Sequence, residues 1–423
     1  MPEAFRIDAL SPKGEGIGAS KRERVFIDRA LPGDLVEAKL RRDIDGVLRG
    51  DVVRLIEASP HRVEPPCPHY ALCGGCTLQH ATDAFYRDWK SGLVRAALSG
   101  KNIAPTRWRA PVFLPPGGRR RITFTAEKQG RTMALGYSRR RQRQIVAVDS
   151  CLIADPAIMA LRDKLPLLLA PLLQEGKPAT AFIQSIGGRF ELVVTGPVGR
   201  DGKPDAAVRD AMATLADALA IDRVSWRAHL GDVPEVMIAR SALRARFGAL
   251  DVALPPLGFQ QPTPAGEAAL VAAVMEALPA AGRFADLFAG SGTFSGPMLA
   301  RGAVDAFENS ATAVHALDNA KGDLPLKAMR RDLYRAPLTR DEAARYNALV
   351  FDPPRAGAEA QARELAKSAV PVLVAVSCNP ATFARDARIL VDGGYRLDCV
   401  QVIDQFTFSH HIELVAKFSK ARG

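Results

Sequence analysis

The chain has 423 residues, of which 48% are hydrophobic and 24% charged, and its formal net charge at pH 7 is +11. This length exceeds what one hydrophobic core normally organises, so we expect two or three domains of a soluble globular protein. The longest apolar run, at 165–174, is too short for a membrane span, and the positive charge favours a polyanionic partner.

The first 60 residues read as short β-strands. The alternating runs "AFRIDAL", "RVFIDRAL", "DLVEAKLRR" and "DVVRLIEAS" are separated by turns rich in glycine and proline. This spacing predicts a small β-barrel. The opening "MPEAFRID" lacks the apolar stretch of a signal peptide, and we expect the six cysteines to stay out of disulfides. We therefore predict a cytoplasmic protein without a membrane partner.

Two further regions follow the predicted barrel. Residues 61–255 begin with a cysteine-dense loop, mix strands and helices, and contain the arginine runs 119–121 and 139–143. These runs either hold phosphates or are solvated charge. Residues 256–423 alternate strand-like runs with alanine-rich helical stretches, a pattern typical of a parallel sheet with helices on both faces. The predicted domains are therefore 1–60, 61–255 and 256–423.

The loop "CPHYALCGGC" carries three closely spaced thiols, Cys67, Cys73 and Cys76. In a cytoplasmic protein such a group indicates a metal site rather than disulfides. Cys151 can supply a fourth ligand, and His69 or His80 can substitute for it. Thiolates suit zinc and iron–sulfur clusters alike; the asymmetric spacing favours a cluster, but the spacing alone leaves both open.

The stretch "ADLFAGSGTF" at 285–294 reads as a strand, a glycine-rich turn and the start of a helix near Thr293. Such turns let a ligand approach the backbone closely. Glu308 ends the next predicted strand, where a carboxylate can bind ribose hydroxyls, and Asp332 follows a third. The turn lacks the longer dinucleotide fingerprint, so it favours a nucleoside-type cofactor.

Three groups follow at later strand ends. Asp352, in "VFDPPRAG", lies at the tip of a fourth strand and is followed by Arg355, where amino-directed methyltransferases have an aromatic residue. Cys378 ends the buried run "PVLVAVSC" and precedes a helix expected to begin near Ala381. Glu413 begins a late strand that can lie beside the one carrying Cys378. Alone, Cys378 reads as a buried small residue and Glu413 as a solvated charge; together they indicate chemistry at one sheet edge.

These motifs resemble those of the RNA uracil-5-methyltransferases, in particular the branch that carries an iron–sulfur cluster and modifies 23S ribosomal RNA. The resemblance rests on "SCNPATFARD", "DPPRAG", "DLFAGSGTF", H-x-E and C-x5-C-x2-C, and covers nearly the whole chain. It implies an α/β multidomain fold: an N-terminal OB-like TRAM β-barrel that binds RNA, a central α+β domain with an iron–sulfur loop, and a C-terminal Rossmann-like class I methyltransferase domain.

The resemblance also implies roles for single residues. Cys378 would be the nucleophile and Glu413 the general base. The 4Fe-4S ligands would be Cys67, Cys73, Cys76 and Cys151. The contacts to S-adenosylmethionine would be Gln261, Phe288, Thr293, Glu308, Asp332 and Asp352. The sequence departs from the family at Thr263, Thr293 and Asp332, where other members often have asparagine.

The implied activity is methyl transfer from S-adenosylmethionine to C5 of a specific uridine in 23S rRNA, through a covalent bond between Cys378 and C6 of the base. One alternative is a methyltransferase for the T-loop uridine of tRNA. Another is an iron–sulfur RNA-binding protein without catalysis. A cytosine-5 methyltransferase fits the Glu413 element less well. No obligate protein partner is expected.

Overall fold

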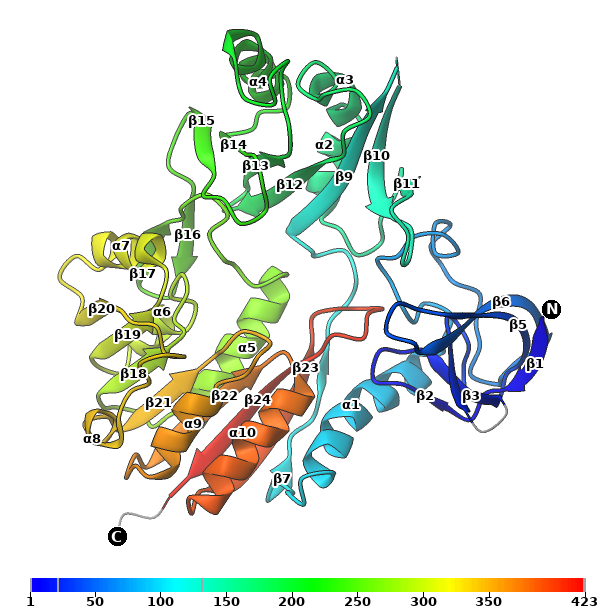
Figure 1. Ribbon diagram of the computed structural model, residues 1–423. Coiled ribbons are helices and arrows are strands. Elements are labelled where there is room, and N and C mark those ends of the chain that lie inside the picture. Colours follow the sequence, from blue (N-terminus) through cyan, green and yellow to red (C-terminus); the bar gives the residue numbers. More distant parts are fainter. Residues whose placement is uncertain (1, 21–22, 131, 421–423) are drawn as a thin grey trace. The chain divides into compact units, whose positions relative to one another are not determined.

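The computed structural model describes residues 2–20, 23–130 and 132–420 (Figure 1). Its contacts form two compact units: Met1–Arg95 with Ser138–Val146 and Phe406–His411, and Ala96–Tyr137 with Ala147–Gln405 and Ile412–Gly423. The outer ends of the first and third predicted domains, residues 1 and 421–423, lie outside the described residues, and the three-domain division stays a prediction. No described helix combines the length and apolar character needed to cross a membrane.

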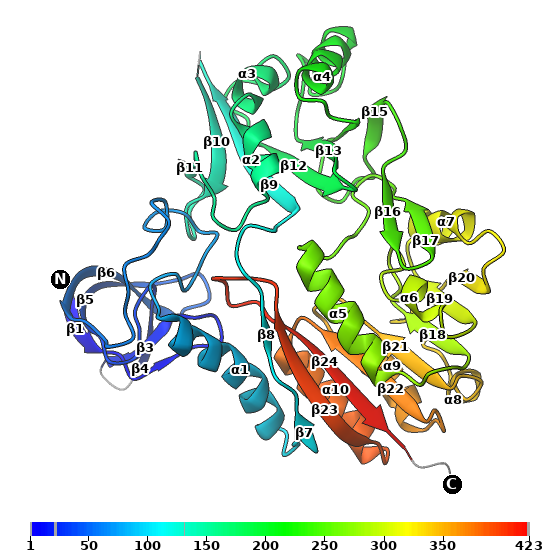
Figure 2. The same ribbon diagram turned by 180° about the vertical axis from the view of Figure 1, so that it is seen from behind.

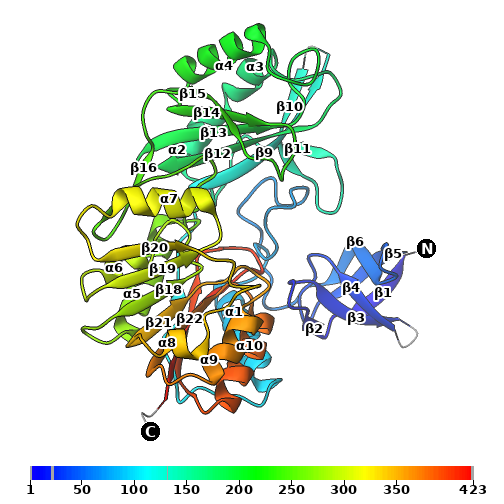
Figure 3. The same ribbon diagram turned by 60° about the vertical axis from the view of Figure 1, so that its left-hand side comes forward.

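The first unit opens with one six-stranded sheet, whose strands curl around a small core (Figure 3). Its strands are β1 (Glu3–Arg6), β2 (Ala9–Leu10), β3 (Gly16–Ser20), β4 (Glu23–Ile27), β5 (Leu35–Arg42) and β6 (Leu48–Glu57), in the order β1-β5-β6-β4-β3-β2. Because side chains alternate along a strand, every second apolar residue faces inward. The buried set includes Phe5, Ile7, Val25, Ile27 and Val36.

The cysteine loop of this unit is tied to the returning segment 406–411. The backbone N–H groups of Thr77 and Leu78 donate to the carbonyl of Phe408 at 2.6 and 3.0 Å. Helix α1 (Asp83–Ser99) contributes Tyr86, whose hydroxyl accepts from the Phe408 N–H at 3.0 Å, and the fully buried Lys90, whose ammonium donates to the His411 carbonyl. Segments more than 300 residues apart in the sequence therefore form one structure.

The 139–143 arginine run also belongs to the first unit. Arg141 forms ion pairs with Glu15 and Asp28, and Arg140 lies 3.3 Å from Asp28. Two of its four arginines are therefore neutralised by acids of the six-stranded sheet region, which leaves Arg139 and Arg143 as the members of the run best placed for phosphates.

The second unit contains a mostly antiparallel central sheet, whose order includes β10-β9-β12-β13-β14-β15. Its strands are β9 (Arg121–Gln129), β10 (Thr132–Ser138), β11 (Ile145–Ala147), β12 (Ala179–Ile186), β13 (Arg189–Thr195), β14 (Arg223–Arg227) and β15 (Glu235–Ala239). Its helices are α2 (Pro156–Arg162), α3 (Leu165–Leu169) and α4 (Ala206–Ala218). Helix α4 agrees with the helical segment expected in this region.

The second unit also contains a larger sheet in the order β20-β19-β18-β21-β22-β24-β23-β7, with β8 beside β23. Its strands are β7 (Arg107–Trp108), β8 (Val112–Phe113), β18 (Phe284–Leu287), β19 (Val304–Glu308), β20 (Leu326–Arg330), β21 (Ala348–Phe351), β22 (Val372–Ser377), β23 (Arg396–Asp404) and β24 (Glu413–Ser419). Strands β18 to β22 run parallel, and β24 runs antiparallel to β22 and β23. The expected alternation of strands and helices is confirmed.

The helices of this region are α5 (Pro264–Ala277), α6 (Ser295–Met298), α7 (Ala311–Ala320), α8 (Arg340–Ala343), α9 (Glu359–Ala366) and α10 (Pro380–Asp392). Figures 1 and 2 show α9 and α10 on one face of the large sheet and α5 on the other. The strand order reverses between β18 and β21. In open α/β sheets, ligands bind outside the carboxyl ends of the strands at such a switch point.

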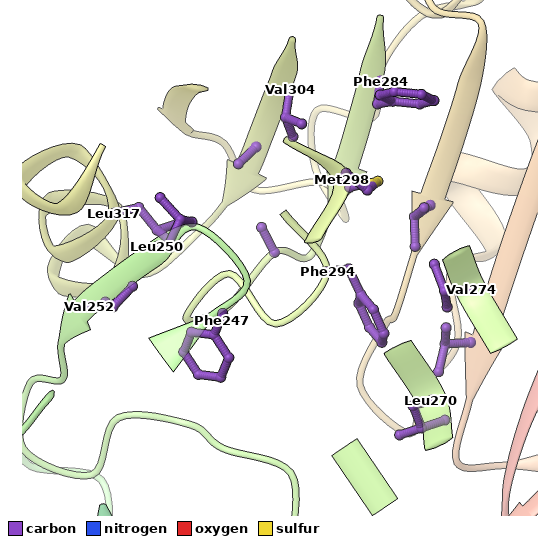
Figure 4. Packing of buried hydrophobic residues seen from close by; sticks show 14 of the residues in the cluster. Phe247, Leu250, Val252, Leu270, Val274, Phe284, Phe294, Met298, Val304 and Leu317 are labelled. Carbon is purple, nitrogen blue, oxygen red and sulfur yellow. The ribbon is translucent and has the colours of Figure 1, made fainter. Parts of the chain in front are cut away.

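A hairpin of β16 (Arg244–Phe247) and β17 (Leu250–Ala253) extends the core of the large sheet. In Figure 4, Leu250 lies beside Leu317 of α7, and Phe294 and Met298 fill the space next to β18. All four side chains are at most 4% exposed. This packing fixes the glycine-rich turn from below, so that its upper side can face a ligand.

Candidate active site

A cavity of about 690 Å³ lies at the switch point, entirely within the second unit. Strand ends of the large sheet surround it, together with the irregular segment that follows β17. Every residue assigned to catalysis or to the methyl donor lines this cavity: Gln261, Phe288, Thr293, Glu308, Asp332, Asp352, Cys378 and Glu413. Seven separate stretches of sequence therefore contribute to one site.

The glycine-rich turn has the backbone that the sequence indicates. Phe288, Gly290 and Gly292 all have positive φ angles, of 62°, 54° and 90°. A Cβ atom on Gly292 would lie 2.6 Å from Leu317, so a larger residue does not fit there. The helix expected near Thr293 is α6, a single turn that begins at Ser295.

The Glu308 carboxylate is held at the cavity edge by two backbone donors. Its oxygens accept hydrogen bonds from the N–H of Gly290 at 3.0 Å and of Ser310 at 2.8 Å. The neighbouring strand end supplies Asp332, whose carboxylate accepts from the Tyr334 N–H at 3.0 Å. Both acids thus have defined positions before any ligand arrives.

Tyr334 is a lining residue that the sequence analysis missed. Its ring lies 5.5 Å from the ring of Phe288, measured between centroids, and is 45% exposed. Two aromatic rings on one side of a cavity suit a flat heterocycle. The available signal was an aromatic residue two positions after Asp332.

The loop that carries Asp352 is held by the start of helix α10. The carbonyl of Arg355 accepts from Asn379 Nδ2 at 2.9 Å and from Thr382 Oγ1 at 3.2 Å. A Cβ atom on Gly357 would lie 2.7 Å from Asp386 Oδ2, so the loop can approach the helix only with glycine there. The polar residues after the cysteine therefore position "DPPRAG".

Cys378 and Glu413 come together because β22 and β24 are neighbours, with Ser377 paired to Leu414. Cys378 is half-buried and lies two residues before helix α10, which begins at Pro380, one residue earlier than expected. Burial, followed by the negative charges of Glu413 and Asp352, raises the pKa of Cys378 to about 11, with Arg355 acting in the opposite direction. The expectation of an electropositive setting is therefore wrong for the ligand-free cavity, where the thiol is neutral at pH 7.

Carboxylates dominate the electrostatics around the switch point. Burial raises the pKa of Asp352 to about 7. Burial also raises the pKa of Asp286, behind the glycine turn, to about 7, although the Ser295 hydroxyl donates to it at 2.6 Å. Negative charge in this cavity is thus costly without a cation, which favours a positively charged ligand.

The arginine run 119–121 does not form a solvated patch. Arg120 is ion-paired with Glu267 at 2.6 Å, and Arg121 donates to the carbonyl of Gln260 at 2.9 Å. These two side chains face the protein rather than phosphates, so the phosphate interpretation is wrong for them.

The four candidate metal-ligating cysteines are all half-buried. Cys73 Sγ accepts from the Gly75 N–H at 3.3 Å, and Cys151 Sγ accepts from the Tyr137 hydroxyl at 3.9 Å. Within the described residues, no three His, Cys, Asp or Glu side chains are gathered as a metal ion requires. The alternative ligand His80 is buried, and burial followed by the charge of Arg62 lowers its pKa to about 3, so its ring is neutral.

Comparison with known proteins agrees with this site. The family described as tRNA (Uracil-5-)-methyltransferase matches residues 327–420, the part that includes Asp332, Cys378 and Glu413. An uncharacterized RNA methyltransferase of Caulobacter vibrioides is 38% identical, over 98% of this chain and 99% of its own length. The 23S rRNA (uracil(1939)-C(5))-methyltransferase RlmD of Psychrobacter arcticus is 30% identical, over 99% of this chain and 90% of its own.

Among solved structures, the fold is similar to that of the Pyrococcus abyssi tRNA (uracil-54, C5)-methyltransferase, crystallised with S-adenosyl-L-homocysteine. The TM-score is 0.75, with 22% identity and 99% of each chain covered. Multiple sheets in a mixed α/β arrangement are thus shared along the whole length. From the sequence relatives and the matched family, this chain belongs to the RNA uracil-5-methyltransferases.

Proposed function

We propose that this enzyme methylates C5 of a specific uridine in 23S rRNA, with Cys378 as nucleophile and Glu413 as general base. The observation that carries the proposal is that Cys378 and Glu413, from adjacent strands, line the same cavity as Glu308 and Asp332. A thiol and a carboxylate beside a nucleoside-sized space are the groups that this reaction requires.

Cys378 begins the reaction by adding its sulfur to C6 of the uracil, because C5 of the ring is a poor nucleophile until C6 is substituted. S-adenosylmethionine, when bound, supplies the methyl group on a positively charged sulfur. The Cys378 proton must leave first, since the pKa of the thiol is about 11 in the ligand-free cavity. Positive charge beside Asp352 and Glu413 would offset the two carboxylates that disfavour the thiolate.

Glu413 completes the reaction by removing the proton from C5 after methylation. The C5–H electron pair then re-forms the C5–C6 double bond, and the bond from C6 to the Cys378 sulfur breaks. The carboxylate is 6% exposed, so little water competes for its proton. The net products are the 5-methyluridine, S-adenosylhomocysteine and one proton.

For the methyl donor we propose six contacts. Glu308 would bind the ribose hydroxyls, Phe288 and Asp332 would border the adenine, and Gln261, Thr293 and Asp352 would surround the amino acid and sulfonium portion. The support is that all six line the cavity and that its walls are acidic and aromatic.

For the RNA, we propose 23S rRNA as substrate and the six-stranded sheet of the first unit as a TRAM-like RNA-binding barrel. Similarity to an RlmD protein along nearly the whole chain supports rRNA. The name of the matched family and the fold of the archaeal tRNA enzyme keep tRNA as the second candidate. In either case the target base has to leave its stack to reach Cys378.

A covalent trap tests this proposal. The protein and S-adenosylmethionine are incubated with 5-fluorouridine-substituted 23S rRNA fragments and, separately, with tRNA. Fluorine cannot leave C5 as a proton does, so a denaturation-resistant adduct should form with rRNA and disappear in Cys378→Ala. An adduct with tRNA alone would transfer the activity to that substrate. No adduct with either RNA, from protein that binds S-adenosylhomocysteine, would contradict uracil-5 methylation.

We also propose that Cys67, Cys73, Cys76 and Cys151 ligate a 4Fe-4S cluster. The donor set fits, and hydrogen bonds to Cys73 Sγ and Cys151 Sγ are of the kind that tune cluster thiolates. The assignment of Cys151 rests on the sequence resemblance alone. Because the described residues do not gather three ligands, we derive no step of methyl transfer through the cluster.

The cluster is tested by anaerobic reconstitution with iron and sulfide, followed by visible absorption and electron paramagnetic resonance of the reduced protein. A cluster signal should form and be lost in Cys73→Ser, while Cys399→Ser, a strand cysteine outside the motif, should retain it. Stoichiometric zinc without a cluster signal would contradict the assignment.

A further inference from the structure

One wall of the cavity is an irregular segment, Leu254–Pro262, between β17 and α5. It contributes Pro255, Leu257, Phe259 and Gln261 to the lining. Leu257 has a φ angle of 61°, a conformation that costs a non-glycine residue energy unless its surroundings impose it. A strained wall without secondary structure needs partners for its backbone groups.

Arginines of the central sheet supply many of those partners. Arg223, on β14, donates to the carbonyls of Leu254 at 2.7 Å and Pro255 at 3.1 Å. Arg223 is itself ion-paired at 2.7 Å with Glu191, whose other oxygen accepts the N–H of the strained Leu257 at 3.2 Å. The first half of the wall is thus anchored to β13 and β14.

Arg120 and Arg121 hold the second half. Arg120 Nε donates to the Gln261 carbonyl at 3.0 Å, and its backbone N–H donates to the Pro262 carbonyl at 2.9 Å. Arg121 donates to the Gln260 carbonyl at 2.9 Å, and its guanidinium lies over the Phe259 ring at 4.9 Å. Charged donors to carbonyls are among the stronger hydrogen bonds in proteins.

The chemistry of Arg121 favours a built-in role rather than a solvent-facing one. Its Nε is buried and has no hydrogen-bond partner among the described residues. Burial and the charges of Arg120 and Arg119 lower the pKa of Arg121 to about 10, so the guanidinium stays protonated at neutral pH. A cation held in so unfavourable a place indicates that its contacts with the wall matter.

We propose that Arg120, Arg121 and Arg223 are positioning residues, which hold the Leu254–Pro262 wall in the shape that accepts the methyl donor. This inference rests on the proposed function of the cavity. The side chain of Gln261 shows what is at stake: its Oε1 accepts from Gln405 Nε2 at 2.8 Å, and this alignment depends on the backbone that Arg120 and Arg121 fix.

The first arm of the test measures hydrogen–deuterium exchange of the peptide containing Leu257–Gln261 in ligand-free protein. Arg120→Gln and Arg121→Gln should each speed exchange there by about tenfold, as expected when a charged hydrogen bond is lost. Arg119→Gln is the matched control, because the Arg119 side chain donates to the Arg121 carbonyl and not to the wall. Unchanged exchange in both variants, or equal loss of protection in the control, would overturn the proposal.

The second arm measures S-adenosylhomocysteine binding by calorimetry. The dissociation constant should rise about tenfold in Arg120→Gln and Arg121→Gln and stay within about twofold in Arg119→Gln. Arg121→Lys, which keeps the charge but lacks the planar fork, should recover part of the loss. Wild-type affinity in Arg121→Gln would refute the positioning role.

The outcomes also separate this inference from the proposed function. If all three arginines instead bound RNA phosphates, each glutamine variant would weaken RNA binding alike and leave S-adenosylhomocysteine binding unchanged. A wild-type protein that binds no S-adenosylhomocysteine would contradict the proposed function, while the exchange arm would still decide whether the arginines hold the wall. Arg223 is left out of both arms, because breaking its buried ion pair with Glu191 would endanger folding.

Discussion

The cavity and the stretch 101–143 carry opposite charge. Four carboxylates line the cavity, those of Glu308, Asp332, Asp352 and Glu413, against one arginine, Arg355. Residues 101–143 contain twelve lysines and arginines and one acidic residue, whereas residues 1–60 contain eleven of each and are neutral. The net charge of +11 therefore describes neither the reaction site nor the N-terminal sheet. Acids surround the place for a sulfonium, and the surplus of cations is concentrated in one stretch of sequence.

The largest effect should follow from removing the catalytic acid of the cavity. Glu413→Gln should lower turnover about 10³-fold, within the range expected for a general base. The variant should still form the bond between Cys378 and C6, so a covalent complex should accumulate on unmodified RNA. The measurement is 5-methyluridine by mass spectrometry together with the adduct on a denaturing gel. Turnover close to that of the wild type would exclude Glu413 as the base.

Salt should separate the two regions almost as strongly. If about six phosphates are bound, RNA affinity should fall on the order of 10³-fold between 50 and 200 mM salt. S-adenosylhomocysteine affinity should change less than about twofold, because the acids of the cavity are shielded from bulk ions. Titrations of both ligands across the same salt series provide the measurement. Parallel salt slopes would mean that the comparison is wrong.

A smaller effect concerns the thiol itself. The negative charge of Asp352 contributes to raising the pKa of Cys378, so Asp352→Asn should lower that pKa. Since pH 8 lies below a pKa of about 11, the thiolate fraction should rise, by about tenfold if the pKa of Cys378 falls by one. Alkylation of Cys378 by iodoacetamide, followed by peptide mass spectrometry, measures this, with Cys399 as internal reference. Slower alkylation in the variant would contradict the electrostatic account.

The smallest effect belongs to a single exposed cation of the basic stretch. Arg143→Gln should weaken RNA binding a few-fold and reduce the slope of log affinity against log salt by about one. Arg340→Gln, an exposed arginine on α8, is the matched control and should leave the slope unchanged. Filter binding across a salt series measures both. Equal slopes in Arg143→Gln and the wild type would remove this residue from the RNA surface.

The convergence of Cys378 and Glu413 was accessible from the sequence, because parallel strand ends meet at one edge and the motifs resemble a known family. The alternation of elements after residue 256 and the helix at 206–218 also follow from local patterns. The orientation of Arg120 and Arg121 did not, since a run of arginines looks the same whether it faces water or the protein. The neutral state of the Cys378 thiol was equally hidden, because it depends on Asp352 and Glu413, which are distant in sequence.

The returning segment 406–411 has a consequence for how the chain is made. Its carbonyls and amides complete hydrogen bonds with Thr77, Leu78 and helix α1, which leave the ribosome more than 300 residues earlier. Domains that form from one continuous stretch can fold during synthesis, starting from the N-terminus. The first unit cannot complete its structure in this way, because its last segment is translated almost at the end. A nascent chain stalled before residue 406 should leave the partners of Lys90 and Tyr86 unmet, and a shortened protein should fail at its beginning rather than at its end.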